Sequence, residues 1–235
     1  MNFVFCPVHY FFGNAGPGSI ADLSPEEARH AFVLRLKPGE KVGLLDGKGT
    51  VCLGEVIFSG PKGAQVLVRE VRNQQAPKPH IHLAVAPVKQ SERMEWLVEK
   101  ITEIGVSEIS PLICDHSERF HFRPDRLEKI AHAAVKQSGR PWQVLLHQPV
   151  RFEAFMSQDF RGAQLIGNQN GRPLKGLFGE ARPDEITLCI GPEGDFSEHE
   201  LALADKKGFI KISFGDVRLR TETAALVIAG ILTGG

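Results

Sequence analysis

The feature that most constrains the fold is an alternation of short apolar runs and helical patterns that extends from residue 81 to the C-terminal end. The runs predicted as strands are residues 81–87, 107–114, 144–146, 163–167, 186–190 and 209–214. Short apolar runs bounded by turns are typical of a parallel sheet that is covered on both faces. This part of the chain is therefore predicted to be an α/β domain.

Helical patterns fill the gaps between these runs. Ser91 is predicted to cap a helix whose apolar face ends at Gly105, and residues 124–137 are predicted to form a second helix. The last helix is predicted to start near Thr221, with Thr221 as its cap. Because that helix is apolar on nearly all sides, it is predicted to be buried.

The first 73 residues follow a different pattern. Apolar runs at 42–45, 51–58 and 65–71 are separated by glycine-bearing loops, which indicates strands joined by hairpins. A run at the N-terminal end is interpreted as an early strand, and Ser24 is predicted to cap one short helix. We predict a small barrel over residues 1–73, a polar linker, and a second domain over residues 80–235.

Composition excludes some classes of partner and site. Lys and Arg together number 28 and equal Asp and Glu, so any polyanion must be held by a local patch. The apolar N-terminal run is too short to span a bilayer. The four cysteines are widely spaced, which favours reduced thiols in the cytoplasm and predicts no metal site.

Three of the late strands are predicted to end in glycine-bearing loops, with the sequences LIGNQNG, CIGPEG and SFGDVRLRTET. In open parallel sheets, ligands bind beyond the carboxyl ends of the strands. No GxGxxG follows a strand and no GxxxxGK[ST] occurs, which disfavours a phosphate-cradling site. The glycines therefore indicate a flat, mostly neutral ligand, although the CIGPEG turn alone is equally compatible with a plain strand-to-helix connection.

Arg220 precedes the apolar last helix, where a cation is unfavourable. Its predicted uses are an ion pair with Glu222 or Glu193, or contact with an anionic substrate.

Two segments near the C-terminal end resemble motifs of a known protein family. GPEGDFSEHE (191–200) and GFIKISFGDVRLRTETAAL (208–226) resemble the two C-terminal motifs of SPOUT-class methyltransferases, and in particular those of the RsmE family. That family methylates uracil N3 in small-subunit (16S) ribosomal RNA. EWLVEKITEIGVSEISPL, KQSGR and HAFVLRLKPGEKVGLLDGKG resemble further segments of the same family, so the similarity spans nearly the whole chain.

The resemblance implies a PUA-like N-terminal barrel and a SPOUT α/β domain with a trefoil knot that pairs as a homodimer. It implies S-adenosyl-L-methionine as cofactor and 16S ribosomal RNA, within the assembled small subunit, as substrate. Arg220 and Glu222 would be the catalytic residues, with Arg220 stabilising charge on the uracil ring and Glu222 orienting Arg220 or removing the proton. The residues implied to bind the cofactor are Gly167, Ile190, Gly191, Pro192, Glu193, Gly194, Phe214, Gly215, Leu219, Arg220, Thr221, Thr223 and Ala224.

Cations and aromatic residues are interleaved between residues 116 and 143. Cations follow phosphates and aromatic rings stack on unpaired bases, but an ordinary solvated helix face has the same composition. The resemblance favours RNA. The residues predicted to bind it are His30, Arg35, Arg119, Arg123, Gln137 and Arg140.

The chain departs from the family pattern at four places. Asp195 replaces a second glycine after GPEG, and Val217 and Arg218 stand where the family has arginine followed by an aliphatic residue. Lys136 replaces a glutamate, and LIGNQNG replaces a segment with histidine and an acid.

Two alternatives remain open from the sequence. One is a non-catalytic RNA-binding protein of the ribosome-assembly type, whose methyltransferase-like domain no longer binds cofactor. The other is a hydrolase that uses the paired carboxylates of Glu193 and Asp195, although no ligand cluster accompanies them.

Overall fold

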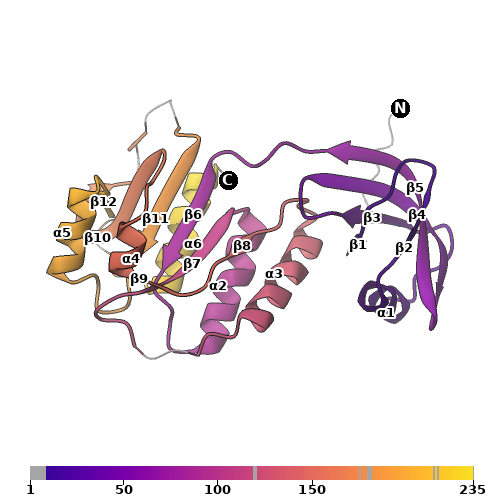
Figure 1. The fold of residues 1–235 in the computed structure, drawn as a ribbon, viewed down its shortest axis with the longest axis horizontal. Coiled ribbons are helices and arrows are strands. Elements are labelled where there is room, and N and C mark those ends of the chain that lie inside the picture. The colour runs from indigo at the N-terminus through magenta and orange to yellow at the C-terminus, as the bar shows by residue number, and fades with distance from the viewer. Residues whose placement is uncertain are drawn as a thin grey trace. The chain divides into compact units, whose positions relative to one another are not determined.

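The structure is a computed structural model of the 235-residue chain, and it describes residues 9–118, 121–174, 176–178, 182–213, 215 and 217–234. It divides into two compact units (Figure 1). The first contains the residues up to 76 together with 132–143, and the second contains 77–131 and the residues from 144 onward.

The first unit is built on a five-stranded sheet with the order β1-β3-β4-β5-β2. Strand β1 pairs parallel to β3, and the other neighbours are antiparallel. Its elements are β1 (His9–Phe12), β2 (Ile20–Asp22), α1 (Pro25–Val33), β3 (Lys41–Leu45), β4 (Thr50–Gly60) and β5 (Gly63–Asn73). The three hairpin strands and the single helix predicted from the sequence are confirmed.

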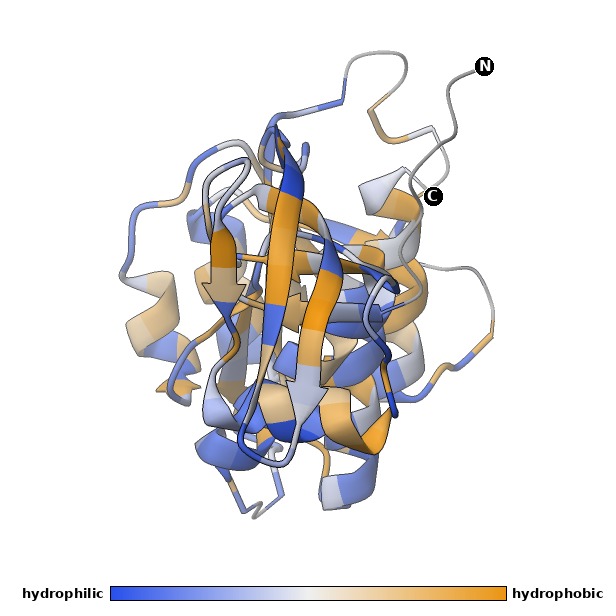
Figure 2. Cartoon of the chain, turned by 90° about the vertical axis from the view of Figure 1, so that its right-hand side faces the viewer, coloured by the Kyte–Doolittle hydropathy of each residue, from blue (hydrophilic) through white to orange (hydrophobic). Residues whose placement is uncertain are grey.

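Local sequence explains these elements. The Ser24 hydroxyl accepts a hydrogen bond from the Glu27 amide at the start of α1, and Pro25 occupies the first turn. In the β3–β4 hairpin, Asp46 Oδ1 accepts from the amides of Lys48 (2.7 Å) and Thr50 (2.8 Å). Figure 2 shows apolar and hydrophilic stretches following one another along the strands of this unit. The apolar ones include the fully buried core residues Phe11, Val42, Leu44, Val66 and Val68.

Trp142, which belongs to the first unit, fixes the conformation of the β3–β4 hairpin. A Cβ atom at Gly49, whose φ is +106°, would lie 2.6 Å from Trp142 Cζ2. The indole Nε1 donates to the carbonyl of Gln75 at 3.0 Å. Glycine is therefore required at position 49 both by φ and by the indole ring.

The second unit contains a seven-stranded parallel sheet, in which six strands follow the order β12-β10-β11-β6-β7-β8 and β9 pairs with β7. The parallel sheet predicted for this region is confirmed. Its elements are β6 (His80–Val85), α2 (Ser91–Ile104), β7 (Glu108–Ile113), α3 (Pro124–Ser138, which crosses the boundary of the units), β8 (Leu145–Leu146), β9 (Val150–Arg151), α4 (Phe152–Met156), β10 (Ala163–Pro173), β11 (Glu185–Ile190), α5 (Glu198–Lys206), β12 (Ile210–Ser213) and α6 (Thr221–Thr233).

Helices cover both faces of this sheet (Figure 1). Successive strand residues point to opposite faces, so Leu83 packs in a core with residues of α2 and α6, while Ala84 packs with residues of α4 and α5. Both strand residues are fully buried. This two-sided burial explains why the strands are continuously apolar.

Two predicted helix caps are displaced by one residue. Ser91 is the first residue of α2 and Gln90 is the cap, without a side-chain hydrogen bond. Thr221 is likewise the first residue of α6, and Arg220 occupies the cap position. In both cases the residue with the hydroxyl group is already part of the helix. The Thr221 hydroxyl donates to the Gly191 carbonyl instead of capping α6.

Two further expectations need correction. Helix α6 is buried only on the face that carries Ala225, Ile228, Ala229 and Leu232, while Ile231 is 42% exposed. Strand β10 continues past the predicted end at 167 to Pro173. Its pairing with β12 shifts in register after Gly167, and the next four residues are not paired with β12. Across the part of the chain that the structure describes, no helix is both long enough and apolar enough to cross a bilayer.

Candidate functional site

The order of the strands creates a pocket at one side of the parallel sheet. Strands β12, β10 and β11 are neighbours and run in the same direction, so their carboxyl ends lie next to one another. The segments that follow β11 and β12, together with Gly167, Asn168 and Gln169 at the register break of β10, line a cavity of about 360 Å³. This size lies within the range of small-molecule sites. The three glycine-bearing loops therefore meet, as the sequence predicts.

Most of the residues predicted to bind a cofactor line this pocket. They are Gly167, Ile190, Gly191, Pro192, Glu193, Gly215, Leu219, Arg220, Thr221 and Ala224. Gly194 and Thr223 do not line it, and Phe214 lies outside the described residues.

The pocket also contains residues that the sequence analysis did not select. They are Asn168, Gln169, Asp195, Ile212, Ser213, Val217, Arg218 and Ile228. Helical spacing could have identified Ile228, because it follows Thr221 and Ala224 at intervals of three and four residues on the same face of α6. Asn168 and Gln169 belong to the LIGNQNG segment, which is part of β10 in the structure. The sequence analysis did not select them because this segment lacks the family's usual histidine and acid.

Hydrogen bonds join the three loops to one another. Arg218 Nη2 donates to the carbonyl of Glu193 at 2.8 Å. Asn168 Nδ2 donates to Asp195 Oδ2 at 3.3 Å. These two bonds connect the loop after β11 to β10 and to the loop after β12, so the pocket walls support each other.

Asp195 adopts a backbone conformation that explains the usual glycine at this position. Its φ is +63°, in the left-handed region that favours glycine and is tolerated by aspartate. Its Oδ1 accepts from the Phe196 amide at 2.8 Å, and its carbonyl lies 3.0 Å from His116 Nδ1. The carboxylate therefore provides hydrogen bonds, including the bond to Asn168, that glycine would lack.

The following helix is anchored by a buried carboxylate. Ser197 and Glu200 form the predicted capping box, and Glu200 is fully buried. Glu200 Oε1 also accepts from the Asp115 amide at 2.9 Å. Asp115 Oδ2 in turn accepts from the Ser197 hydroxyl at 2.6 Å. This network fixes the direction in which the chain leaves the pocket.

The two residues predicted to be catalytic have different environments. Arg220 is exposed and lines the pocket, and its side chain forms no hydrogen bond or ion pair with another described residue. Glu222 is buried and does not line the pocket. The Glu222 carboxylate pairs with Arg93 Nε of α2 at 3.3 Å, and its Oε2 has no hydrogen-bond partner among the described residues. The predicted pairs of Arg220 with Glu222 or Glu193 are therefore not found.

The polar groups and the walls of the pocket define what it can hold. Glu193 and Asp195 supply negative charge, and Arg218 and Arg220 supply positive charge. The apolar lining residues are Ile190, Ile212, Leu219, Ala224 and Ile228. Two glycines leave little room for a side chain, because a Cβ at Gly191 would lie 3.0 Å from the Phe196 ring and one at Gly167 would lie 3.1 Å from Ile190 Cδ1. Such a site suits a partly apolar, zwitterionic molecule.

The candidate RNA-binding residues fall in both units. His30, Arg35, Gln137 and Arg140 are exposed in the first unit, and Arg123 is exposed in the second. Arg119 lies outside the described residues. Arg35 has a φ of +58°, which an L-residue seldom adopts. Although His30 is largely exposed, partial desolvation, and then the nearby charge of Lys136, lower its pKa below the usual value.

Some cations and rings between residues 116 and 143 already have partners. Arg126 pairs with Glu95 through two nitrogen atoms, and Lys136 Nζ lies 2.8 Å from Glu27 Oε1. Phe122 is half-buried against the main core. These groups are less available to RNA than their sequence pattern indicates.

The fold and the pocket together define a class. The second unit is a parallel α/β unit with a small-molecule pocket at its strand ends, and the first unit is built on a five-stranded sheet. The family comparison identifies the class as RNA methyltransferases. The chain belongs to the family described as "RNA methyltransferase domain", whose model matches residues 74–233. Residues 23–69 match the "RNA methyltransferase PUA domain", which confirms the PUA-like N-terminal region.

Individual relatives agree with this family. Ribosomal RNA small subunit methyltransferase E of Aquifex aeolicus is 27% identical over 230 residues, covering 96% of this chain and 99% of the relative. The protein of the same name from Rickettsia conorii is 28% identical and covers 83% and 80%. The structure of the Neisseria gonorrhoeae protein of that name, bound to S-adenosylmethionine, has 28% identity and a TM-score of 0.84, with 97% of each chain covered.

Proposed function

We propose that this chain transfers a methyl group from S-adenosyl-L-methionine to N3 of a uridine in small-subunit ribosomal RNA. The observation that carries the proposal is one pocket that is lined by the register break of β10 and by the loops after β11 and β12. Membership of the RNA methyltransferase family and the names of the relatives support the same reaction.

The pocket residues fit this cofactor. Apolar walls at Ile190 and Leu219 suit a flat adenine ring, and backbone groups of Gly191 and Gly215 are unobstructed by side chains. Glu193 and Arg218 offer opposite charges to an amino acid group. When bound, the cofactor would supply an electrophilic methyl whose S–C bond breaks as the N3–C bond forms, leaving a neutral thioether.

The chain's own residues would prepare the base. Uracil N3 is a poor nucleophile while protonated, so the target base must be unstacked and its deprotonated form favoured. We assign this role to Arg220, whose guanidinium lines the pocket and can stabilise negative charge on the ring. Alignment of N3 with the methyl group would contribute much of the remaining rate.

Glu222 takes a different role in this proposal. Because the carboxylate is buried and paired with Arg93, it positions the first turn of α6, and so Arg220, instead of receiving the N3 proton. The pocket carboxylates and solvent remain as acceptors for that proton.

RNA would be held by exposed cations outside the pocket. The candidates are Arg35 and Arg140 in the first unit and Arg123 in the second. Each neutralised phosphate should contribute a slope of roughly −0.7 to −0.9 to log affinity against log salt. Because the net charge of the chain is zero, we propose the assembled small subunit as the substrate. Such a substrate would place the protein in the cytoplasm.

We also propose that the second unit pairs as a homodimer and contains the trefoil knot implied by the sequence resemblance. Helix α6 supports pairing, because Ile231 is exposed and Leu226 and Val227 are only half-buried in one chain. Light scattering should give twice the chain mass. A monomer at micromolar concentration would contradict the dimer without affecting the assignment of the reaction.

Mass spectrometry of ribosomal RNA nucleosides tests the function directly. Deletion of the protein should remove N3-methyluridine from small-subunit RNA, and the wild-type gene should restore it. Calorimetric titration with S-adenosyl-L-methionine separates the enzyme from a non-catalytic RNA-binding protein, because only an intact pocket gives saturable heat. Unchanged N3-methyluridine in the deletion strain would overturn the proposal.

A further inference from the structure

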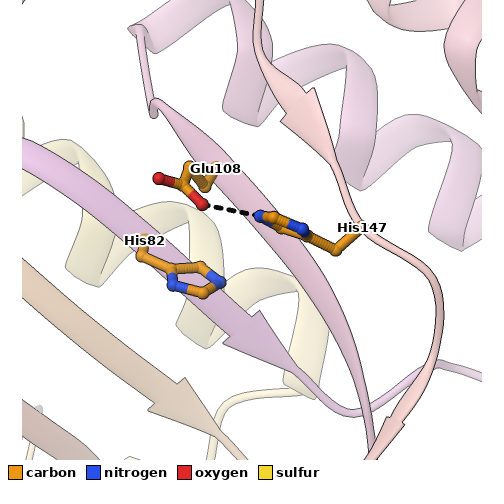
Figure 3. A group of neighbouring side chains, drawn as sticks. All are labelled: His82, Glu108 and His147. Atoms are coloured by element: carbon orange, nitrogen blue, oxygen red, sulfur yellow. Dashed lines mark hydrogen bonds and ion pairs between the residues drawn. The ribbon is translucent and has the colours of Figure 1, made fainter. Parts of the chain in front are cut away.

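A second group of functional side chains lies outside the pocket, on strands β6, β7 and the segment after β8 (Figure 3). It consists of His82, Glu108 and His147, whose candidate ligand atoms all lie within 4.8 Å of one another. His147 Nε2 lies 2.6 Å from Glu108 Oε2, and the rings of His82 and His147 are 5.3 Å apart between centroids. The reaction proposed above uses none of them.

We propose that His82, Glu108 and His147 bind one divalent transition-metal ion, with Zn²⁺ as the preferred ion. Two imidazole nitrogens and one carboxylate oxygen are a ligand set that Zn²⁺ accepts, whereas Mg²⁺ and Ca²⁺ prefer oxygen ligands alone. The three residues are half-buried, so an ion can enter from solvent while the site is partly shielded from it.

Neighbouring groups complete the environment. His80 Nε2 lies 3.3 Å from Glu108 Oε1 and can hold the Glu108 carboxylate in place, while a water molecule can occupy a fourth position. Ser110 Oγ hydrogen bonds with His82 Nε2 at 2.8 Å and orients the ring, as partners of metal-bound histidines commonly do. Binding an ion would replace the Glu108–His147 hydrogen bond with two metal–ligand bonds.

The place of the cluster in the fold indicates a structural ion. His82 is the third residue of β6, Glu108 is the first residue of β7, and His147 follows β8 directly. The His147 amide also donates to the Ile109 carbonyl of β7 at 2.9 Å. The pocket lies instead at the register break of β10 and at the carboxyl ends of β11 and β12. An ion at the cluster would join β6, β7 and the segment after β8, which are neighbours in the sheet, without contacting the substrate.

The alternative is a hydrogen-bonded cluster without an ion, and metal titration distinguishes the two. The full chain is stripped with a chelator and titrated with ZnCl₂ by calorimetry, and its melting temperature is measured with and without zinc. We expect one equivalent per chain and a higher melting temperature with zinc. Glu108→Gln and His147→Gln should each weaken binding at least about tenfold. Both side chains are partly exposed, which limits the effect on folding.

His199→Gln is the matched control, because His199 is an exposed histidine of α5 outside the cluster and should leave affinity unchanged. Co²⁺ is the second probe. Visible absorption typical of nitrogen and oxygen ligands, lost in both cluster variants, would support the site. Thiolate charge-transfer bands would instead assign the ion to cysteines and overturn the proposal. Absence of saturable zinc binding, or equal affinity in Glu108→Gln, His147→Gln and wild type, would overturn it as well.

Discussion

The hydroxyl of Thr221 donates a hydrogen bond of 2.9 Å to the carbonyl of Gly191, and this bond joins the first residue of α6 to the loop after β11. Thr221 is only 4% exposed, so the bond is shielded from water. The Thr221 side chain therefore holds two walls of the pocket together, and it does not cap α6.

Replacing Thr221 with Val should loosen the pocket. The substitution keeps the shape of the side chain but leaves the Gly191 carbonyl without its partner, at a cost of about 1–2 kcal/mol. We expect affinity for S-adenosyl-L-methionine to fall about tenfold, measured by calorimetry. Thr221→Ser retains the hydroxyl and should bind nearly as well as wild type. Equal affinity in Thr221→Val and wild type would show that the bond does not shape the site.

Arg220→Ala should separate binding from chemistry. Because Arg220 lines the pocket and its side chain is not hydrogen-bonded to any described residue, its loss should leave cofactor affinity and melting temperature nearly unchanged. Turnover on small subunits should fall by about 10²-fold or more, as for the loss of one charge-stabilising donor. Arg220→Lys, which retains the charge, should lie between them. Full activity of Arg220→Ala would remove this residue from the mechanism.

The Arg93–Glu222 pair should be required for stability. Arg93→Leu leaves a buried carboxylate uncompensated and should lower the free energy of unfolding by about 2–4 kcal/mol. Adding Glu222→Gln should recover most of this loss, because the neutral amide costs less to bury. Denaturant titration measures both effects.

Glu222→Gln alone then tests its chemical role. If Glu222 positions α6 as proposed, this variant should keep substantial turnover once it is folded. Turnover as low as that of Arg220→Ala, with unchanged stability, would instead assign Glu222 to proton removal.

Reversing the charge of Lys136 alone should destabilise the first unit, whereas reversing the charges of both Lys136 and Glu27 should be better tolerated. Glu27 is 6% exposed and is paired with Lys136, whose Nζ also lies 5.9 Å from the centre of the Phe12 ring. Lys136→Glu would place two carboxylates together and should destabilise the first unit by about 3 kcal/mol or more. The double variant Glu27→Lys with Lys136→Glu should regain much of that loss in thermal denaturation. If the double variant is no more stable than Lys136→Glu alone, the ion pair does not determine stability here.

Asp46 should make the first unit sensitive to acid. Burial acts to raise the pKa of Asp46, but hydrogen bonds from Thr50 and Lys48 outweigh it and hold the pKa below its usual value. A folded-state pKa below the unfolded one contributes stability above about pH 4, and this contribution is lost as pH falls through the folded pKa. Unfolding free energies of wild type should therefore fall more between pH 5 and 3 than those of Asp46→Asn. Parallel pH curves would contradict this.

Local pattern determined much of this protein. Apolar runs and glycines placed the strands and helices of both units close to their observed bounds, because period and turn chemistry act within a few residues. The glycines at 167, 191 and 215 likewise indicated the pocket, since parallel strands end on the same side of a sheet. The resemblance to RsmE proteins added the reaction, which periodicity could not supply.

Only the tertiary structure decided which distant side chains meet. Glu222 pairs with Arg93 of α2 instead of its near neighbour Arg220. Asn168 of β10 bonds to Asp195, which follows the neighbouring strand β11. His82 and Glu108 gather with a histidine that follows β8. Residues 132–143 belong to the first unit although the chain around them belongs to the second. The Asn168–Asp195 bond and the cluster of His82, Glu108 and His147 follow from the strand order β12-β10-β11-β6-β7-β8. The hydrophobic period of a segment indicates which of its faces is buried, but it does not indicate which strand lies beside it.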